Sequence, residues 1–233
     1  KHHCAGVRAY YSGVSGLDPQ GFIELIFLKE LLPGYLWIFP LPDGRANVGL
    51  GLRSDIVRKR RVDLKKLLAD TIAGHPQLQK RFAKARREGP VQGMGLPLAS
   101  KRWPISGDGH MLIGDAAHLI DPFTGEGISH AMISGVHAAD VASEALQETP
   151  AGQAIPHAAL KDYDARVWKR LGKELAISTR LQKLADRPWL FNFVVNKAAR
   201  NPVLADTISC MFNDLDMRER LKRPGFYLKL LFG

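Results

Sequence analysis

The sequence of 233 residues predicts an α+β protein in three parts. Four short runs rich in aromatic and β-branched residues come first, which is typical of an antiparallel sheet. An apolar run, a glycine loop and a long helical pattern follow, which is typical of an α/β layer, and the remainder is helical. We therefore expect a sheet domain with two helices over residues 1–104, a strand–loop–helix segment over 105–149 and a helical region over 150–233.

The strands of the first part are joined by strong turn signals. Pro33-Gly34 and Pro42-Asp43-Gly44-Arg45 combine the fixed φ of proline with glycines that accept a positive φ, as tight turns require. Val91–Leu98 is a further strand-like stretch. The first four strands are expected at Val7–Tyr11, Phe22–Leu28, Tyr35–Leu41 and Ala46–Leu52.

Helices are expected in all three parts. In the first, Asp63–Ala73 has one apolar face and an aspartate that can cap its first turn, and Pro76 starts a helix that reaches Arg87. In the third, 158–185 is helical and Pro188, Pro202 and Pro224 break the rest into shorter pieces. The apolar tail 226–232 is expected to pack onto the protein, with contact to a membrane surface as the alternative.

The second part contains a change of pattern. His110–Ile113 is a short, mostly apolar run of the kind buried in an α/β layer, and it leads directly into Gly114-Asp115. After Gly127, apolar and small residues recur at spacings of three and four, which predicts a long buried helix that ends before Pro150. Its buried face would consist of Ile128, Ala131, Met132, Gly135, Val136, Ala139, Ala142 and Leu146.

Composition excludes several classes of protein. An apolar content of 45% suffices for a core, and no run of about 18 apolar residues predicts a spanning helix. Cys4 and Cys210 are too distant in sequence to suggest a disulfide framework, so we expect a reducing cytoplasm, with peripheral attachment to a membrane left open. Because the sequence starts at Lys1 without an initiator methionine, we expect it to be part of a longer protein.

The formal net charge of +10 would suit an anionic partner or cofactor. Its densest basic run, Arg58–Arg61, lacks neighbouring aromatic residues that could stack on bases. We expect this run to be a solvated loop or helix entrance, and we expect no nucleic-acid partner.

One ordered set of residues indicates a cofactor site. A strand would deliver the carboxylate of Asp115, a glycine loop would let backbone approach a flat ligand, and the next helix would direct free N–H groups at it. A flavin fits both features, because its ring edge collects negative charge on reduction and its ribityl chain carries hydroxyls. The predicted cofactor-binding residues are Gly114, Asp115, Pro122, Gly125, Glu126, Gly127 and Ile128.

These residues resemble a motif pair of the FAD-dependent oxidoreductases of the p-hydroxybenzoate hydroxylase type. In that family a Gly-Asp pair contacts the ribityl part of FAD, and Pro-x-x-Gly-x-Gly opens a helix beside the flavin. The corresponding segments here are Ile113–His118 and Pro122–Ile128. The resemblance implies that 105–149 is the C-terminal segment of an FAD-binding domain.

A nearer resemblance is to the geranylgeranyl reductases, whose aromatic-x-Trp-x-Phe-Pro strand lines the substrate cavity. Tyr35-Leu36-Trp37-Ile38-Phe39-Pro40 matches this pattern, and 47–51 resembles the partner strand. Period-two alternation puts Tyr35, Trp37 and Phe39 on one face. The resemblance implies that these three residues and Pro40 contact a prenyl chain, whose double bonds the enzyme reduces with electrons from NADPH or ferredoxin.

Two features depart from the family patterns. The N-terminal Gly-x-Gly-x-x-Gly that binds the ADP half of FAD does not occur in this sequence, so we expect the chain alone to bind FAD weakly or not at all. Flavin-dependent halogenases have a strand motif with two tryptophans, and Tyr35 stands in place of the first. This departure argues against halogenation.

Other interpretations stay open. The enzyme could be a monooxygenase that hydroxylates an aromatic or polyketide substrate, or the chain could be a basic, non-catalytic module that binds a membrane or nucleic acid. Asp115, His118, Asp121 and His130 could be metal ligands, although their spacing matches no known metal-site pattern. Glu126 could simply complement the dipole of the helix that follows it.

Overall fold

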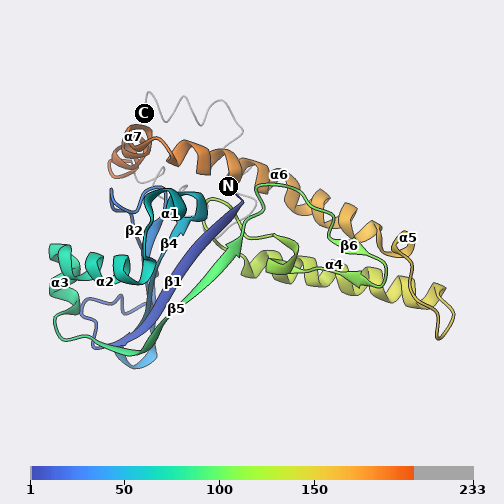
Figure 1. The fold of residues 1–233 in the computed structure, drawn as a ribbon, viewed down its shortest axis with the longest axis horizontal. Coiled ribbons are helices and arrows are strands. Elements are labelled where there is room, and N and C mark those ends of the chain that lie inside the picture. The colour runs from blue at the N-terminus through green and yellow to red at the C-terminus, as the bar shows by residue number, and fades with distance from the viewer. Residues whose placement is uncertain (1, 202–233) are drawn as a thin grey trace. The chain divides into compact units, whose positions relative to one another are not determined.

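The computed structural model describes residues 2–201 (Figure 1). Contacts between Cα atoms divide the chain into two compact units, one ending at Leu96 and the other beginning at Pro97 and including His2. The α+β class is confirmed. The two units are described one after the other.

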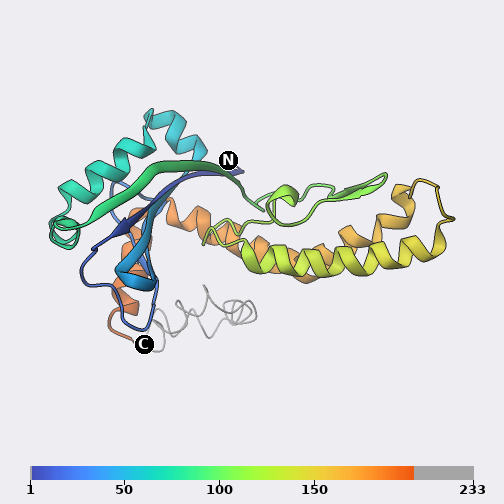
Figure 2. The same ribbon diagram turned by 90° about the horizontal axis from the view of Figure 1, so that it is seen from below.

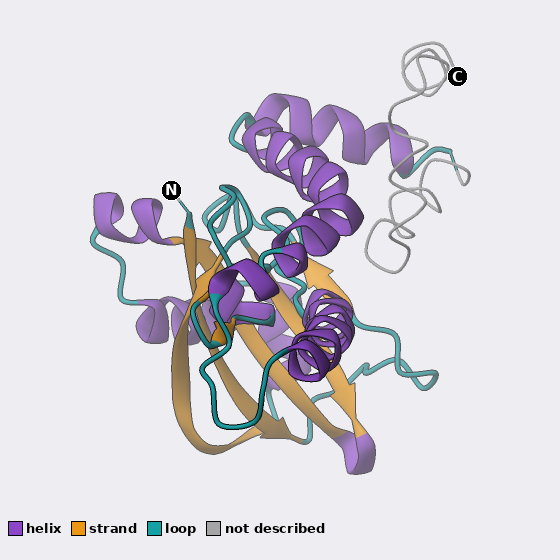
Figure 3. Cartoon of the chain, turned by 90° about the vertical axis from the view of Figure 1, so that its right-hand side faces the viewer, coloured by secondary structure: helices purple, strands orange, loops and turns teal. Residues whose placement is uncertain are grey.

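The first unit is built on one five-stranded sheet with the strand order β2-β3-β4-β1-β5 (orange in Figure 3). Each of the pairs β1–β4, β2–β3 and β3–β4 is antiparallel, as the turn signals predict. β2 is shorter than expected, and β5 begins earlier. The strands are β1 His3–Ser12, β2 Glu24–Ile26, β3 Tyr35–Leu41, β4 Arg45–Arg53 and β5 Arg86–Pro97.

Two turns of this unit use glycine for different reasons. Between β3 and β4, in the short helix η1 (Pro42–Gly44), Asp43 and Gly44 have φ angles of 63° and 68°, as the predicted hairpin connection requires. Gly34 was expected to need a positive φ, and this expectation is wrong. A β-carbon on Gly34 would instead collide with the carbonyl oxygen of Gly51, so a close approach of two backbones demands glycine there.

Three helices belong to the first unit: α1 Ser54–Arg60, α2 Leu64–Gly74 and α3 Pro76–Phe82. Asp63 caps α2 as predicted, accepting hydrogen bonds from the N–H groups of Lys65 and Lys66. The short helix α1 is not foreseen by the sequence pattern, and the expectation of a loop or helix entrance for the basic run is wrong. Arg58–Arg60 form the last turn of α1, where cations stabilise the helix dipole, and Arg61 is its C-cap. α3 does not reach Arg87, because the chain enters β5 at Arg86.

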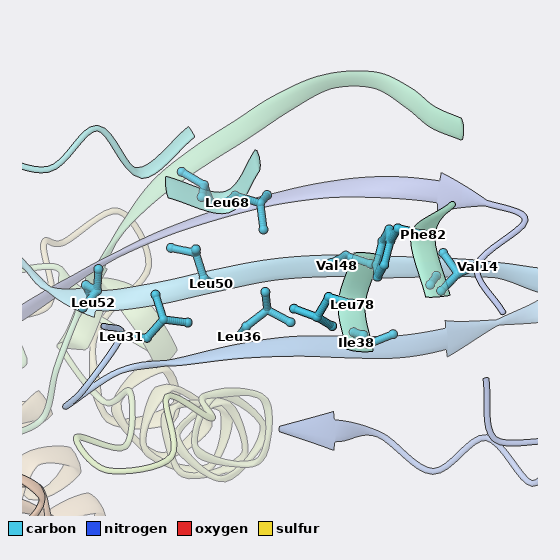
Figure 4. Packing of buried hydrophobic residues seen from close by; sticks show 12 residues of the cluster. Val14, Leu31, Leu36, Ile38, Val48, Leu50, Leu52, Leu68, Leu78 and Phe82 are labelled. Atoms are coloured by element: carbon cyan, nitrogen blue, oxygen red, sulfur yellow. The ribbon is translucent and has the colours of Figure 1, made fainter. Parts of the chain in front are cut away.

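The core of the first unit lies between one face of the sheet and the helices. Figure 2 shows α2 and α3 along that face. Figure 4 shows how β3 and β4 contribute alternate side chains to this core, which Leu68 of α2 and Leu78 and Phe82 of α3 complete. The opposite face of the sheet carries the intervening residues, as period-two alternation requires. The remaining buried members include Val7, Val14, Leu31, Leu36, Ile38, Ala46, Val48, Leu50 and Leu52.

The second unit is mostly helical. The long helices α4 and α6 lie side by side in both views (Figures 1 and 2). The long helix expected over 158–185 is interrupted at Lys161, whereas α7 begins at Pro188 as predicted. The elements are β6 Ser106–Gly107, β7 His110–Met111, η2 Gly114–Ala117, α4 Ile128–Glu148, α5 His157–Leu160, α6 Asp162–Ala185 and α7 Pro188–Ala198.

No helix within residues 2–201 is long and apolar enough to cross a membrane. The expectations for Pro202, Cys210, Pro224 and the tail 226–232 lie outside the described residues.

The expected buried strand His110–Ile113 is wrong. Only His110 and Met111 form a strand, and their partner is the two-residue β6. Leu112 and Ile113 are 38% and 46% exposed. A run of apolar residues becomes a central strand only when neighbouring strands pair with it on both sides, and the described residues place none beside Leu112 and Ile113.

Helix α4 has the predicted length but buries a different face. Ile128, Met132, Val136 and Leu146 are between 61% and 77% exposed. The helix has a second stripe at the same period, and that stripe packs against α6, where His130 meets Glu174. The buried residues of α4 are His130, Ser134, Val141 and Ala145.

Candidate flavin loop and aromatic face

The predicted Gly114-Asp115 pair forms a tight turn, η2, that packs against α4. Gly114 is buried with a φ of 53°, and its N–H donates to the hydroxyl of Ser134 at 3.1 Å. A β-carbon on Gly114 would lie 2.8 Å from that of Ala131. Glycine is therefore required by both the backbone conformation and the approach of α4.

The two predicted cofactor motifs meet at Asp115 and Gly127. A β-carbon on Gly127 would lie 3.2 Å from the carboxylate oxygen Oδ1 of Asp115. Asp115 itself is exposed, and Gly127 is the residue directly before α4. The fold thus brings a solvent-accessible carboxylate to the N-terminus of a helix of 21 residues.

The loop from Asp121 to Gly127, which we name the flavin loop after its predicted cofactor, is held by its first residue. Asp121 is fully buried, and its Oδ1 accepts the N–H groups of Phe123 at 2.9 Å and Thr124 at 2.8 Å. The backbone closes the loop, because the N–H of Asp121 donates to the carbonyl of Glu126 and that of Gly125 donates to the carbonyl of Asp121. Asp121 therefore organises the loop.

Gly125 and Glu126 serve the geometry of this loop. Gly125 has a φ of 75°, which favours glycine. The two carboxylate oxygens of Glu126 accept the N–H of Ser129 at 2.8 Å and its hydroxyl at 2.7 Å. Glu126 thus accepts hydrogen bonds from the first turn of α4. A carboxylate at this helix start also complements the helix dipole, which is the alternative interpretation of this residue.

Among the described residues, no group of three or more His, Cys, Asp or Glu side chains is placed to hold a metal ion. Of the four residues weighed as metal ligands, Asp121 and His130 are buried and hydrogen-bonded to the protein. His118 follows η2 with a φ of 55°, and its ring lies 5.9 Å from that of Trp103.

His130, in the first turn of α4, is part of a buried charged pair. Its Nδ1 lies 2.6 Å from the carbonyl oxygen of Leu119, and its Nε2 lies 3.3 Å from Oε1 of Glu174 in α6. Burial disfavours the imidazolium, but hydrogen bonds to Glu174 and Leu119 and the charges of Asp121 and Glu174 outweigh it and raise the pKa of His130. The Leu119 carbonyl and the Glu174 carboxylate both accept hydrogen bonds, which favours the doubly protonated ring.

This pair predicts a pH-dependent stability. Because the pKa of His130 is higher in the folded than in the unfolded state, its contribution is complete below the unfolded pKa of about 6.5 and is lost as the pH rises through the folded value. The charged groups that face the pair are Asp121 and Arg170. We expect the fall in melting temperature between about pH 6 and pH 9 to be smaller in His130→Gln. Identical pH slopes would contradict this assignment.

The aromatic residues of β3 lie on the sheet face that does not carry the helices of the first unit. Ring centroids are 5.7 Å apart for Phe27 and Tyr35, 6.2 Å for Tyr35 and Trp37, and 6.0 Å for Trp37 and Phe39. The predicted common face is therefore confirmed as a continuous aromatic row. Pro40 alternates to the other face of the strand.

Trp37 packs against glycines of β4 and β1. It pairs with Gly49 across β3 and β4, and a β-carbon on Gly49 would collide with the indole ring. Gly6 of β1 and Gly51 of β4 complete this glycine floor, each with its β-carbon position 3.8 Å from the ring. The indole N–H donates to Oδ1 of Asn47 at 3.1 Å, so the ring is fixed in its plane.

Sequence reasoning missed the part of the site that α6 supplies. Glu174, Ser178 and Gln182 each contact α4 or the flavin loop. The available signal was three polar residues at spacings of four in a helix with apolar neighbours at 171 and 175.

Comparison with known proteins finds similarity to the geranylgeranyl reductases. Residues 5–86 match the family model of the geranylgeranyl reductase catalytic domain. A digeranylgeranylglycerophospholipid reductase of Thermoplasma volcanium is 39% identical over 52% of this chain and 29% of its own length. One from Methanothermobacter thermautotrophicus is 32% identical over 78% of this chain and 43% of its own. The chain thus spans less than half the length of these relatives.

Solved structures show the same fold. A geranylgeranyl bacteriochlorophyll reductase-like protein of Thermoplasma acidophilum superposes with a TM-score of 0.73 at 24% identity, covering 91% of this chain and 53% of the other. A flavin-dependent brominase gives a TM-score of 0.59 at 26% identity, covering 89% and 49%. The fold is therefore shared by a reductase-like protein and a brominase, whereas the two sequence relatives named above are both reductases.

Proposed function

We propose, from the relationship of this chain to the geranylgeranyl reductases, that it forms the substrate-binding and flavin-ring portion of an FAD-dependent enzyme that reduces double bonds of a prenyl chain. The observation that carries the proposal is the contact between the two cofactor motifs. Asp115 and Gly127 lie together at the N-terminus of α4, although twelve positions separate them in sequence. The aromatic row on β3 supports the choice of an apolar substrate.

The residues present fit a flavin. Asp115 is exposed and would accept hydrogen bonds from ribityl hydroxyls, while Gly125 is exposed and carries no side chain that would hinder a flat ring. The N-terminus of α4 at Ile128 would favour negative charge at the ring edge. Bound FAD would supply hydride transfer to the alkene, and the protein would supply orientation and exclusion of water.

The aromatic row would bind the prenyl chain. Tyr35, Trp37 and Phe39 present an apolar surface that is only partly buried within the first unit, and the glycine floor leaves room for the indole of Trp37 close to the sheet. Pro40 follows this row in sequence, but because it alternates to the other face of the strand, we assign it no contact with the prenyl chain. Because prenyl lipids lie in membranes, the proposal includes contact of a cytoplasmic protein with a membrane surface. We propose NADPH or ferredoxin as the electron donor.

The visible absorption spectrum of the purified full-length protein tests the class of enzyme. We expect the two absorption bands of an oxidised flavin, with FAD released on denaturation. A colourless full-length protein that takes up no added FAD would contradict the proposal.

Replacing Trp37 by alanine tests the aromatic row. In the full-length protein we expect kcat/KM for a prenyl substrate to fall about 30-fold, because losing the contact surface of one aromatic ring corresponds to about 2 kcal/mol. Trp37→Phe should restore much of it. Trp189→Ala is the matched control, since Trp189 is 68% exposed on α7. Unchanged kcat/KM in Trp37→Ala would remove this strand from the substrate site.

A further inference from the structure

Helix α6 carries a polar stripe that faces the cofactor region of the second unit. Glu174, Ser178 and Gln182 recur every fourth residue and so lie on one face of the helix. Glu174 is 6% exposed and Ser178 is 1% exposed. Buried polar side chains are costly unless hydrogen-bonded, so their partners show what they do.

The partners of two of these residues are consecutive positions of the flavin loop. The hydroxyl of Ser178 donates to Oδ1 of Asp121 at 2.5 Å and accepts the N–H of Phe123 at 3.0 Å. The amide nitrogen Nε2 of Gln182 donates to the carbonyl oxygen of Pro122 at 2.6 Å. Two side chains of α6 thus bind three successive loop residues more than 50 positions away in sequence.

These contacts restrict the loop where a cofactor site needs it to be fixed. Apolar packing alone would hold α6 against α4, because Leu171 and Leu175 are already in the core. Directional hydrogen bonds also fix the position and orientation of the loop backbone relative to α6. A binding site displaced by about 1 Å loses much of its effect, so supporting contacts of this kind tune a site without touching its ligand.

We propose that Ser178 and Gln182 are positioning residues, which hold the flavin loop of residues 121–127 in the position in which its backbone meets the flavin ring. The inference rests on the proposed function, since it needs a flavin at this loop. It goes further by assigning part of the cofactor site to α6, which contributes no residue of the two cofactor motifs.

Two variants of the full-length protein test the inference, with a neighbour as control. Ser178→Ala removes both loop contacts of the hydroxyl. Gln182→Glu keeps the shape of the side chain but places an acceptor against the carbonyl of Pro122. Thr179→Ala is the matched control, because its hydroxyl donates to the carbonyl of Leu175 within α6. Affinity for FAD, the visible spectrum of bound flavin and the flavin midpoint potential are measured for each.

We expect each loop variant to bind FAD about tenfold more weakly, the equivalent of about 1.4 kcal/mol, with a shifted flavin spectrum and a more negative midpoint potential. Thr179→Ala should match the wild type. If Ser178→Ala does not fold, Ser178→Cys replaces it, which keeps the volume and weakens the donor.

The outcomes separate the two proposals. If the wild-type full-length protein binds no flavin, the proposed function fails. If the wild type binds flavin and both loop variants match Thr179→Ala in affinity, spectrum and potential, the positioning inference fails alone. Loop variants with a lower melting temperature but a wild-type flavin spectrum and affinity at about 10 °C would have a purely structural defect, which also overturns the inference.

Discussion

Replacing Gly49 by alanine is expected to lower the free energy of unfolding by about 3 kcal/mol or more, because overpacking that forces backbone to move is among the costliest substitutions. The added β-carbon would collide with the indole of Trp37 on one side and with the carbonyl oxygen of Val7 on the other. Neither can yield easily, since Trp37 is held by Asn47 and Val7 lies in the β1–β4 ladder.

Urea denaturation of Gly49→Ala measures this effect, with Gly95→Ala as the matched control. Gly95 is also a strand glycine, in β5, but a β-carbon there would meet nothing within 4 Å. Its substitution should change stability by no more than about 0.5 kcal/mol. Equal effects in the two variants would show that the glycine floor under Trp37 is not needed for packing.

Replacing Asp115 by alanine is expected to weaken FAD binding by the full-length protein 10- to 100-fold, because hydrogen bonds to a charged group contribute about 1.5–3 kcal/mol. The exposed carboxylate has its Oδ1 beside Gly127, at the helix N-terminus where the ribityl chain would lie. Asp115→Asn should lose less, since the amide still accepts a hydrogen bond.

Fluorescence titration of the apoprotein with FAD gives the affinities. Asp140→Ala, an exposed aspartate of α4, is the control for a general change in charge. If Asp115→Ala and Asp140→Ala bind FAD equally well, Asp115 does not contact the cofactor and the Gly114-Asp115 turn has a structural role only.

The sequence predicts the first unit well because its signals are local. Alternation and turn residues define Tyr35–Leu41 to the residue, and the capping aspartate locates α2. The second unit is predicted less well because its packing is long-range. Helix α4 has two stripes at helical period, and the docking of α6 decides which is buried. Periodicity alone cannot make that choice.

The candidate site also has a part that the sequence predicts and a part that it does not. Glycines and the aspartate of the cofactor motifs can be found from the sequence, because turns and helix starts require particular residue types. The role of Asp121 cannot be found in that way. Its carboxylate accepts bonds from its own loop and from Ser178, 57 positions further along, and this second contact exists only after α6 docks. The contact of Gln182 with Pro122 has the same origin.

Anaerobic mixing of the reduced full-length protein with a prenyl lipid tests the central claim most directly. The proposed reductase transfers hydride from flavin to the alkene without oxygen. We predict that the absorption of oxidised flavin returns when the lipid is added under anaerobic conditions and that a saturated product forms in equal amount. Flavin that stays reduced until oxygen is admitted, followed by a hydroxylated product, would contradict the claim and indicate a monooxygenase.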